Sequence, residues 1–265
     1  MHLKRWLTGI VAAPFLITII GFGPRWLFYL LLFFVSLFGL IEFYTMVAPQ
    51  LPKFIRRTNY CLTFLLFVAF YTRQVLLGQV ILVLWAFVPM TFFMLTHHSP
   101  SQQWTEDISK SALGPIYVGL PLSMLVMIDL HPNGNLWIFF LLAVIFSNDT
   151  GAFYFGRLFG RHKLYESISP GKTWEGAVGG VLSSMIVGLW FLHLLRLHKI
   201  DVSIVGLILA LSIVGQIGDL VESMLKRNHG VKDSGRILPG HGGILDRIDA
   251  LLFSIPILYI FLIWP

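Results

Sequence analysis

A run of charged residues and glycines between positions 219 and 249 interrupts a chain that is otherwise mostly apolar. Closely spaced carboxylates bind divalent cations, and lysine and arginine neutralise phosphate oxygens. The run contains ten charged side chains: Asp219, Glu222, Lys226, Arg227, Lys232, Asp233, Arg236, Asp246, Arg247 and Asp249. This mixture of acids and bases predicts chemistry on phosphate groups, with a metal ion held by carboxylates.

The first part of the run lies at the end of an apolar helix. Spacings of three, three and four residues place four polar side chains on one helical face: Gln216, Asp219, Glu222 and Lys226. The alternative interpretation is a helix end whose charges reach toward water, with a Glu222–Lys226 pair. Asp219 favours a functional role, because a carboxylate inside or at the edge of a membrane span is costly and usually functional.

The second part of the run is a glycine-rich loop followed by a helix that opens with Asp-Arg-Ile-Asp. Gly242 and Gly243 leave the backbone free to approach a ligand, and His241 precedes them. Asp246 and Asp249 are three residues apart, so they share one face near the helix N-terminus and repel each other. A divalent cation relieves that repulsion, and such oxygen ligands suit Mg²⁺, which bridges substrate phosphates. Helix capping is the alternative role for Asp246 alone.

The segment Ser-Pro-Gly-Lys-Thr, residues 169–173, indicates a second phosphate-binding element. A P-loop needs a glycine five residues before Gly171, and Glu166 stands there, so that motif is excluded. We expect a polar loop that leads into a helix, whose first backbone N–H groups favour an anion such as phosphate. Lys172 would neutralise that anion, and Glu175 is placed to cap the helix or to hold a basic partner.

Two further patterns lie in the helices around this segment. Asp149 stands beside Asn148 near the inner end of a span, where an interhelical hydrogen bond is the alternative to a functional role. Small residues also repeat every four positions, which predicts a helix-packing seam rather than chemistry. This stripe consists of Gly176, Gly180, Ser184 and Gly188.

The composition identifies the solvent around the chain. Hydrophobic residues make up 56% of it and charged residues only 12%, with a mean hydropathy of +0.78. Soluble domains carry about a quarter charged residues, so the deficit indicates lipid. The single cysteine, Cys61, excludes an internal disulfide. The net charge of +6 fits the basic cytoplasmic loops of a membrane protein better than a nucleic-acid-binding surface.

Nine apolar segments predict an all-α, polytopic membrane protein with its active site at the cytoplasmic membrane boundary. The predicted spans are 6–22, 26–47, 59–72, 75–96, 110–129, 135–155, 174–195, 202–221 and 247–264. The first resembles a signal peptide, but Pro24 follows the possible cleavage site, so we expect an uncleaved span. We expect a single membrane domain, with N-terminal helices over residues 1–130 and catalytic helices over residues 131–265.

The distribution of charge predicts the orientation of these spans, because cytoplasmic loops are rich in lysine and arginine. If residues 59–96 form two helices that break near Arg73 and the N-terminus is cytoplasmic, fifteen basic residues lie inside and four outside. One long helix would invert that bias, so we predict two helices and a C-terminus outside the cytoplasm. The polar segments at Asp149, 169–175 and 219–249 then all lie on the cytoplasmic side. This arrangement suits phosphoryl or nucleotidyl transfer between a soluble nucleotide and a membrane lipid.

Residues 223–249 resemble the signature of the phosphatidate cytidylyltransferase family, also called the CDP-diacylglycerol synthases. That signature has a serine before Lys-Arg, then Lys-Asp, then His-Gly-Gly-x-x-Asp-Arg-x-Asp, and every fixed position is present here. Residues 149–152 and 169–176 are also similar to the family, although Gly171 stands where the family more often has lysine. The resemblance covers the C-terminal half of the chain, and the first 130 residues match only as apolar helices.

The resemblance implies that CTP and phosphatidate react to give CDP-diacylglycerol and pyrophosphate in phospholipid synthesis. It also implies an integral membrane enzyme that depends on Mg²⁺, forms a homodimer and lies in the inner membrane of a bacterium. Its metal ligands are expected to be Asp219, Asp246 and Asp249, holding one or two cations, of which the second can be monovalent.

The motifs and the resemblance together assign roles to individual side chains. The expected catalytic residues are Asp219, Lys226, Arg227, Asp246 and Arg247. The expected substrate-binding residues are Ser169, Lys172, Thr173, Glu175, Lys232, His241, Gly242 and Gly243. The phosphatidate phosphate is already ionised at neutral pH, so His241 is expected to position the substrate rather than to act as a base.

Two alternative functions fit part of these observations. A CTP-dependent lipid-alcohol kinase would transfer the γ-phosphoryl group with a similar set of residues, but the complete signature argues against it. A transporter of an anionic solute would also have many spans. Transporters tend to show repeated halves and sites near the membrane midplane, whereas the polar residues here gather at one face and no repeat is visible.

Overall fold

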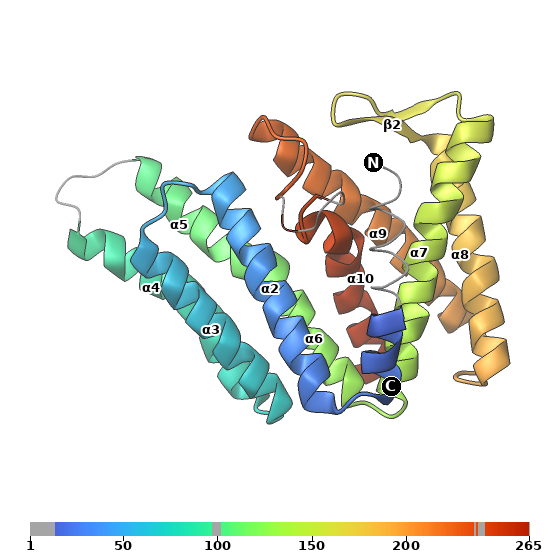
Figure 1. Ribbon diagram of the computed structural model, residues 1–265, viewed down its shortest axis with the longest axis horizontal. Helices are drawn as coiled ribbons and strands as arrows, with labels where there is room; N and C mark the ends of the chain where they lie inside the picture. Colours follow the sequence, from blue (N-terminus) through green and yellow to red (C-terminus); the bar gives the residue numbers. More distant parts are fainter. Residues whose placement is uncertain (1–13, 97–101, 236, 238–241, 265) are drawn as a thin grey trace. The chain divides into compact units, whose positions relative to one another are not determined.

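The structure, a computed structural model, describes residues 14–96, 102–235, 237 and 242–264. Most of this part is helical, because a backbone in lipid must satisfy its hydrogen bonds internally. Residues 14–22 are helical, and the helices that follow are α2 (Arg25–Val47), α3 (Lys53–Tyr71), α4 (Val75–Thr96), α5 (Gln102–Gly114), η1 (Pro115–Gly119), α6 (Leu120–Asp129), α7 (Gly134–Phe159), α8 (Trp174–Leu195), α9 (Val202–Asn228) and α10 (Leu245–Ile263). Strands β1 (Lys163–Tyr165) and β2 (Ser169–Thr173) pair antiparallel between α7 and α8 (Figure 1).

The predicted apolar segments coincide with these helices, except that residues 6–13 lie outside the described part. Within that part, six helical segments are long and apolar enough to cross a membrane: α2, α4, the continuous run 102–129, α7, α8 and α9. The chain is therefore an integral membrane protein with a helical fold. Helices α3 and α10 carry charged residues in their first turns, which lowers their hydropathy. The total of nine spans stays a prediction.

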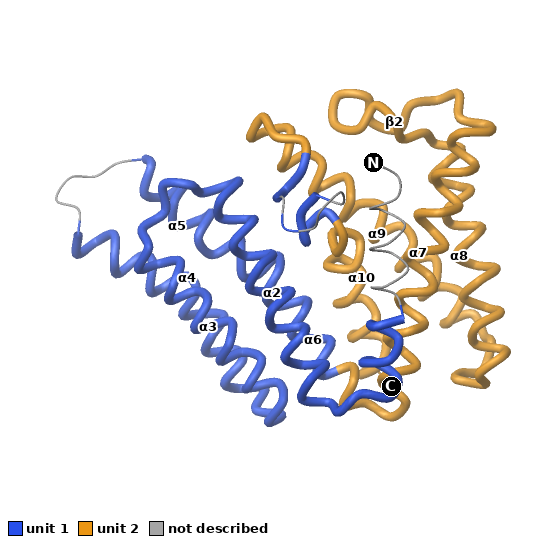
Figure 2. The backbone as a smooth tube through the Cα atoms, viewed as in Figure 1, with its two compact units in different colours: residues 1–127, 233–246 blue, residues 128–232, 247–265 orange. Residues whose placement is uncertain are grey.

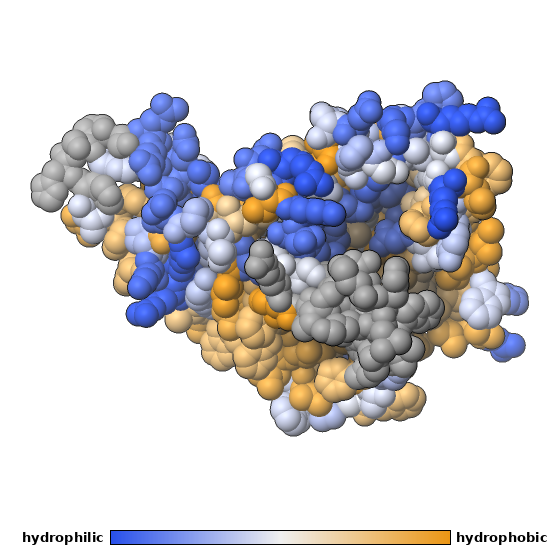
Figure 3. Space-filling model, turned by 45° about the horizontal axis from the view of Figure 1, so that its top comes forward, coloured by the Kyte–Doolittle hydropathy of each residue, from blue (hydrophilic) through white to orange (hydrophobic). Residues whose placement is uncertain are grey.

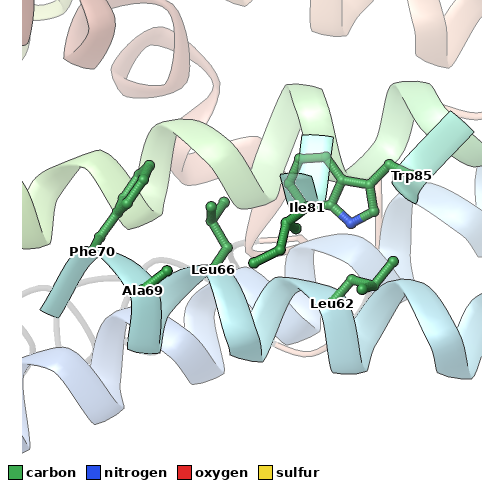
Figure 4. Close-up of a cluster of buried hydrophobic side chains, with 6 residues drawn as sticks. All are labelled: Leu62, Leu66, Ala69, Phe70, Ile81 and Trp85. Atoms are coloured by element: carbon green, nitrogen blue, oxygen red, sulfur yellow. The ribbon is translucent and has the colours of Figure 1, made fainter. Parts of the chain in front are cut away.

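The predicted break within residues 59–96 is present. Helix α3 ends at Tyr71 and α4 begins at Val75, and Arg73 between them has a left-handed φ of 57°. The two helices then pack against each other, because their facing sides are apolar. The buried cluster between them consists of Leu62, Leu66, Ala69, Phe70, Ile81 and Trp85 (Figure 4).

The chain divides into two compact units (Figure 2). Unit 1 comprises residues 1–127 and 233–246, and unit 2 comprises residues 128–232 and 247–265. The boundary after residue 127 lies close to the predicted division between N-terminal and catalytic helices. The stretch from 233 to 246, however, belongs with the N-terminal helices although it carries much of the signature.

Unit 2 is built on a close pair of helices, α7 and α8, whose contact confirms the predicted packing seam. Gly176, Gly180, Ser184 and Gly188 are all buried in α8. A Cβ added at Gly180 would lie 2.6 Å from Asn148 Oδ1 and 2.8 Å from the Asn148 carbonyl oxygen, so only glycine allows this approach. Ser184 Oγ also donates a hydrogen bond of 3.2 Å to the Val144 carbonyl.

The opposite side of α8 is exposed and hydrophobic. Large side chains recur every four residues along it: Trp174, Val178, Leu182, Ile186, Trp190 and Leu194. A helix that buries small residues and exposes large apolar ones is suited to a lipid surface. In the space-filling view, hydrophobic residues cover the flank of these helices, while hydrophilic residues gather around the hairpin end of unit 2 (Figure 3).

Candidate active site

The polar face predicted on α9 is present, and each of its side chains has a partner within unit 2. Asp219 Oδ2 accepts an ion-pair contact from Lys172 Nζ at 2.7 Å. Glu222 is fully buried and forms an ion pair with Lys226, which is 13% exposed. The alternative interpretation of this face included this Glu222–Lys226 pair, which is present, but the burial of Glu222 does not fit a helix end whose charges reach toward water.

Gln216, the first member of that face, connects α9 to the α7–α8 pair. Its Nε2 donates to Asn148 Oδ1 at 2.9 Å and to the Ala177 carbonyl at 3.0 Å. Asn148 is fully buried. These bonds fix the rotation of α7, and with it the direction of the neighbouring Asp149.

Three carboxylates from three helices gather around this point in unit 2. Asp149 of α7 lies within electrostatic range of Asp219 and Lys172. Asp249 of α10 lies within electrostatic range of Asp219, Asp149 and Lys226. Hard oxygen donors of this kind suit Mg²⁺. In the described part of the chain, no three His, Cys, Asp or Glu side chains are close enough to coordinate one ion directly.

The β1–β2 hairpin holds Lys172 in place. Residues 169–173 form strand β2 rather than the predicted loop, because their backbone pairs with β1 in register from Lys163 opposite Thr173 to Tyr165 opposite Ser169. Local composition, with Pro170 and a glycine, is typical of a loop and does not reveal a partner strand. The predicted helix start directly after this segment is correct, since α8 begins at Trp174.

Two of the predicted substrate-binding residues have structural contacts at the base of this hairpin. Thr173 is the N-cap of α8, and its Oγ1 accepts a hydrogen bond of 3.1 Å from the Gly176 N–H. Glu175 holds a basic partner, as the sequence suggested. Its carboxylate is 2.6 Å from His162 Nδ1 and accepts hydrogen bonds from the backbone N–H groups of Arg161 and His162.

Three other cations of the predicted site, Arg227, Lys232 and Arg247, belong to unit 2. Arg227 is exposed and donates from Nε to the Ile168 carbonyl at 3.3 Å, which places it beside the start of β2. Lys232 and Arg247 are also exposed. All three side chains therefore lie at the surface of unit 2.

The glycine-rich part of the signature belongs to unit 1. Asp246 Oδ2 accepts hydrogen bonds from the Gly243 N–H at 2.8 Å and the Ser234 N–H at 3.0 Å, so it fastens the loop at the start of α10. Both donors precede α10, so these bonds fasten the loop rather than cap the helix, and the metal role of Asp246 stays a prediction. Gly242 has φ +81°, which a residue with a side chain rarely adopts. His241 lies outside the described residues.

Asp149 and Glu42 were not among the predicted metal ligands, but each lies close to part of the predicted site. Asp149 joins Asp219 and Asp249 in unit 2. Glu42 of α2 accepts hydrogen bonds from the start of α10 in unit 1. Glu42 is the only acid of an otherwise apolar helix, and that isolation is the sequence signal that identifies it.

Comparison with known proteins extends over nearly the whole chain. A family model described as the cytidylyltransferase family matches residues 3–264. Curated proteins named phosphatidate cytidylyltransferase from Staphylococcus aureus (strain COL) and Staphylococcus epidermidis are 34% and 35% identical over 261 residues, or 98% of this chain and 98% of each relative. A protein of the same name from Staphylococcus saprophyticus is 42% identical over 178 residues, which cover 66% of this chain and 68% of the relative.

These matches confirm the resemblance carried by the signature. They also include the first 130 residues, where the motifs gave no specific resemblance. The family model matches nearly the whole chain, and the relatives align with it at 34–35% identity over 98% of its length. The chain belongs to the cytidylyltransferase family.

Proposed function

We propose that this chain transfers the cytidylyl group of CTP to phosphatidate, giving CDP-diacylglycerol and pyrophosphate. The family and the names of its relatives support this reaction. The observation that carries it is the group of charges in unit 2. Lys172 pairs with Asp219, and Asp149 and Asp249 lie within electrostatic range, on helices whose flanks are apolar. A water-soluble triphosphate and a lipid phosphate can both reach charges in such a position.

The reaction forms one P–O bond and breaks another. A phosphate oxygen of phosphatidate bonds to the α-phosphorus of CTP. The bond from that phosphorus to the oxygen shared with the β-phosphorus breaks, and pyrophosphate leaves with the electron pair. The attacking phosphate is already ionised at neutral pH, so the protein must mainly align the groups and neutralise their charge.

We infer that Mg²⁺ is the cation of this site, with one or two cations in total and a monovalent ion as the possible second. Asp219 and Asp249 are the proposed ligands in unit 2, with Asp149 beside them, and Asp246 remains a proposed ligand from the signature. Carboxylates with room for water are the donor set that Mg²⁺ prefers. When bound, the cation supplies charge neutralisation and orientation for the triphosphate.

The basic side chains complete the proposed site. Lys172, with the hydroxyls of Ser169 and Thr173, would hold the triphosphate at the hairpin. Lys226, Arg227 and the exposed Lys232 and Arg247 would bind the leaving pyrophosphate or the lipid phosphate. His241, Gly242 and Gly243 are proposed to approach the substrate through the glycine-rich loop, and Glu175 supports the hairpin through His162.

We further propose a homodimer in the inner membrane of a bacterium, with the N-terminus and the polar end of unit 2 in the cytoplasm. The excess of basic residues in the loops on that side supports this orientation. CTP is a cytosolic metabolite, so the same orientation brings the charged group to its nucleotide.

The test of the function is the position of the label that reaches the lipid. Purified protein in mixed micelles is incubated with phosphatidate, Mg²⁺ and CTP labelled at either the α- or the γ-phosphorus. Cytidylyl transfer predicts α-label in the lipid extract, dependent on phosphatidate and abolished by EDTA. Entry of γ-label with diacylglycerol as acceptor would identify the lipid kinase instead, and no label from either nucleotide would refute both.

A further inference from the structure

Glu42 is an unusual residue for its position. It is the only acid of α2, a helix long and apolar enough to span a membrane, and it is 4% exposed. A buried carboxylate in such a helix is costly unless hydrogen bonds compensate it. The hydrogen-bond partners of Glu42 therefore explain how its carboxylate is tolerated in this helix.

Those partners are Ser234, Ile244 and Leu245, which flank the glycine-rich part of the signature and belong to unit 1. Glu42 Oε1 accepts from the Ile244 N–H at 3.0 Å, and Oε2 accepts from the Leu245 N–H at 2.9 Å. Oε2 also accepts from Ser234 Oγ at 3.1 Å. The first N–H groups of a helix have no partner inside the helix, so Glu42 caps α10 from a different helix.

Two glycines of the loop are shaped around this carboxylate. A Cβ at Gly235 would lie 2.2 Å from Glu42 Oε1, and a Cβ at Gly243 would lie 2.1 Å from Ser234 Oγ and 2.4 Å from Glu42 Oε2. Neither position leaves room for a side chain while Glu42 is present. The close approach of Glu42 thus accounts for glycine at position 235, and Glu42 and Ser234 together account for glycine at position 243.

Asp246 is linked to Glu42 through the same loop residue. Ser234 Oγ lies 3.0 Å from Asp246 Oδ2 and 3.1 Å from Glu42 Oε2. Glu42 thereby fixes the Ser234 hydroxyl and the first turn of α10 that carries Asp246. We propose that Glu42 is a positioning residue for the reaction: it sets Ser234 and the first turn of α10, which carries Asp246, in their working geometry. The expected effect of Glu42 on the rate of cytidylyl transfer rests on the proposed function. Its expected effect on hydrogen exchange at Ile244 and Leu245 does not.

The test uses Glu42→Gln, which keeps the size of the side chain but replaces one acceptor oxygen with a donor. Hydrogen exchange followed by mass spectrometry reports the amides of Ile244 and Leu245 without requiring any activity. We expect their exchange to rise by about tenfold or more, the fold change of losing a charge-assisted hydrogen bond. We expect kcat for cytidylyl transfer to fall by about tenfold or more, with a smaller change in KM for CTP.

Two further variants keep the test decisive. Ser234→Ala removes only the shared hydroxyl and is expected to give a smaller change of the same kind. Ser36→Ala is the matched control, since Ser36 is a buried polar residue of the same helix, and it should leave exchange at Ile244 and Leu245 unchanged.

The outcomes separate the two proposals. Unchanged exchange at Ile244 and Leu245 in Glu42→Gln would overturn the positioning role, whatever the activity. A rise in exchange throughout the chain with a lower melting temperature would also overturn it, because Glu42 would then only stabilise the fold. If the wild type transfers no label from CTP but exchange at these amides still rises locally, the proposed function fails and the structural link from Glu42 to the loop stands.

Discussion

Two Glu–Lys pairs at the same four-residue spacing lie in very different surroundings. Glu222 and Lys226 of α9 are 0% and 13% exposed, whereas Glu106 and Lys110 of α5 are 56% and 36% exposed. Water screens an exposed pair, so it contributes little to stability. A buried pair is different, because removal of one partner leaves the other charge desolvated.

We predict that Glu222→Gln destabilises the protein by about 3 kcal/mol, the usual cost of breaking a buried pair. It should also reduce cytidylyl transfer, because Lys226 loses the charge that holds it. Glu106→Gln, the matched control, should change stability by less than about 1 kcal/mol. Thermal unfolding in detergent, followed for both variants, tests this. Equal shifts of the two melting temperatures would contradict the assigned role of burial.

At the level of residues, spacing along one segment revealed some of the site and not the rest. Asp219, Glu222 and Lys226 share a helical face, so their common surroundings could be predicted from the sequence. Asp149 approaches Asp219 only because α7 packs beside α8 and α9, and Glu42 bonds to Leu245, which is 203 residues away in the sequence. Contacts between distant segments leave no periodic pattern in a single sequence.

The α7–α8 seam supports a prediction about elements. A Cβ at Gly180 meets Asn148 Oδ1 at 2.6 Å, whereas a Cβ at Gly206 in α9 meets nothing within 4 Å. Gly180→Ala should therefore force α7 and α8 apart and cost about 1–3 kcal/mol. Gly206→Ala, the same change in an open position, should be neutral or stabilising by up to about 1 kcal/mol.

The seam also bears on activity, because Asn148 accepts a hydrogen bond from Gln216 and precedes Asp149. Gly180→Ala should lower cytidylyl transfer more than Gly206→Ala does, in rate assays on both purified variants. If Gly180→Ala is as stable and active as the wild type, the helices are not in the close contact described here.

Among the elements, the helices could be predicted and the hairpin could not. Apolar length alone predicts helices in a lipid environment, and the break at Arg73 followed from the charge bias. Strand β2 pairs with only three residues of β1, and Ser-Pro-Gly-Lys-Thr has the composition of a loop. The Glu175 carboxylate also bonds to His162, directly before β1, and the sequence does not identify His162 as its partner.

For the whole molecule, the orientation in the membrane is the most direct prediction. Lys163 lies in the hairpin before α8 and Lys199 lies after its other end, so the two should be on opposite sides of the membrane. In a Cys61→Ala background, Lys163→Cys and Lys199→Cys are labelled with a membrane-impermeant maleimide in intact cells. We predict labelling of Lys199→Cys from outside and of Lys163→Cys only after permeabilisation, and the reverse pattern would contradict the orientation.

The division of the chain into two units could not be predicted from the sequence. The signature is continuous from residue 223 to residue 249, yet residues 233–246 belong to the unit of the N-terminal helices. Glu42 explains this grouping, because it binds the loop to α2. The N-terminal helices contain no recognisable motif, but one of them, α2, holds part of the signature through Glu42.

If the charged group around Asp219 carries out cytidylyl transfer, the variant Asp219→Asn should lose that activity. Asp201→Asn is the matched control, since Asp201 caps the other end of the same helix through the Ile204 N–H at 3.0 Å and asparagine caps equally well. We predict that incorporation of α-label from CTP into phosphatidate falls by about a hundredfold or more in Asp219→Asn and is retained in Asp201→Asn. Equal rates in Asp219→Asn and the wild type would contradict the account.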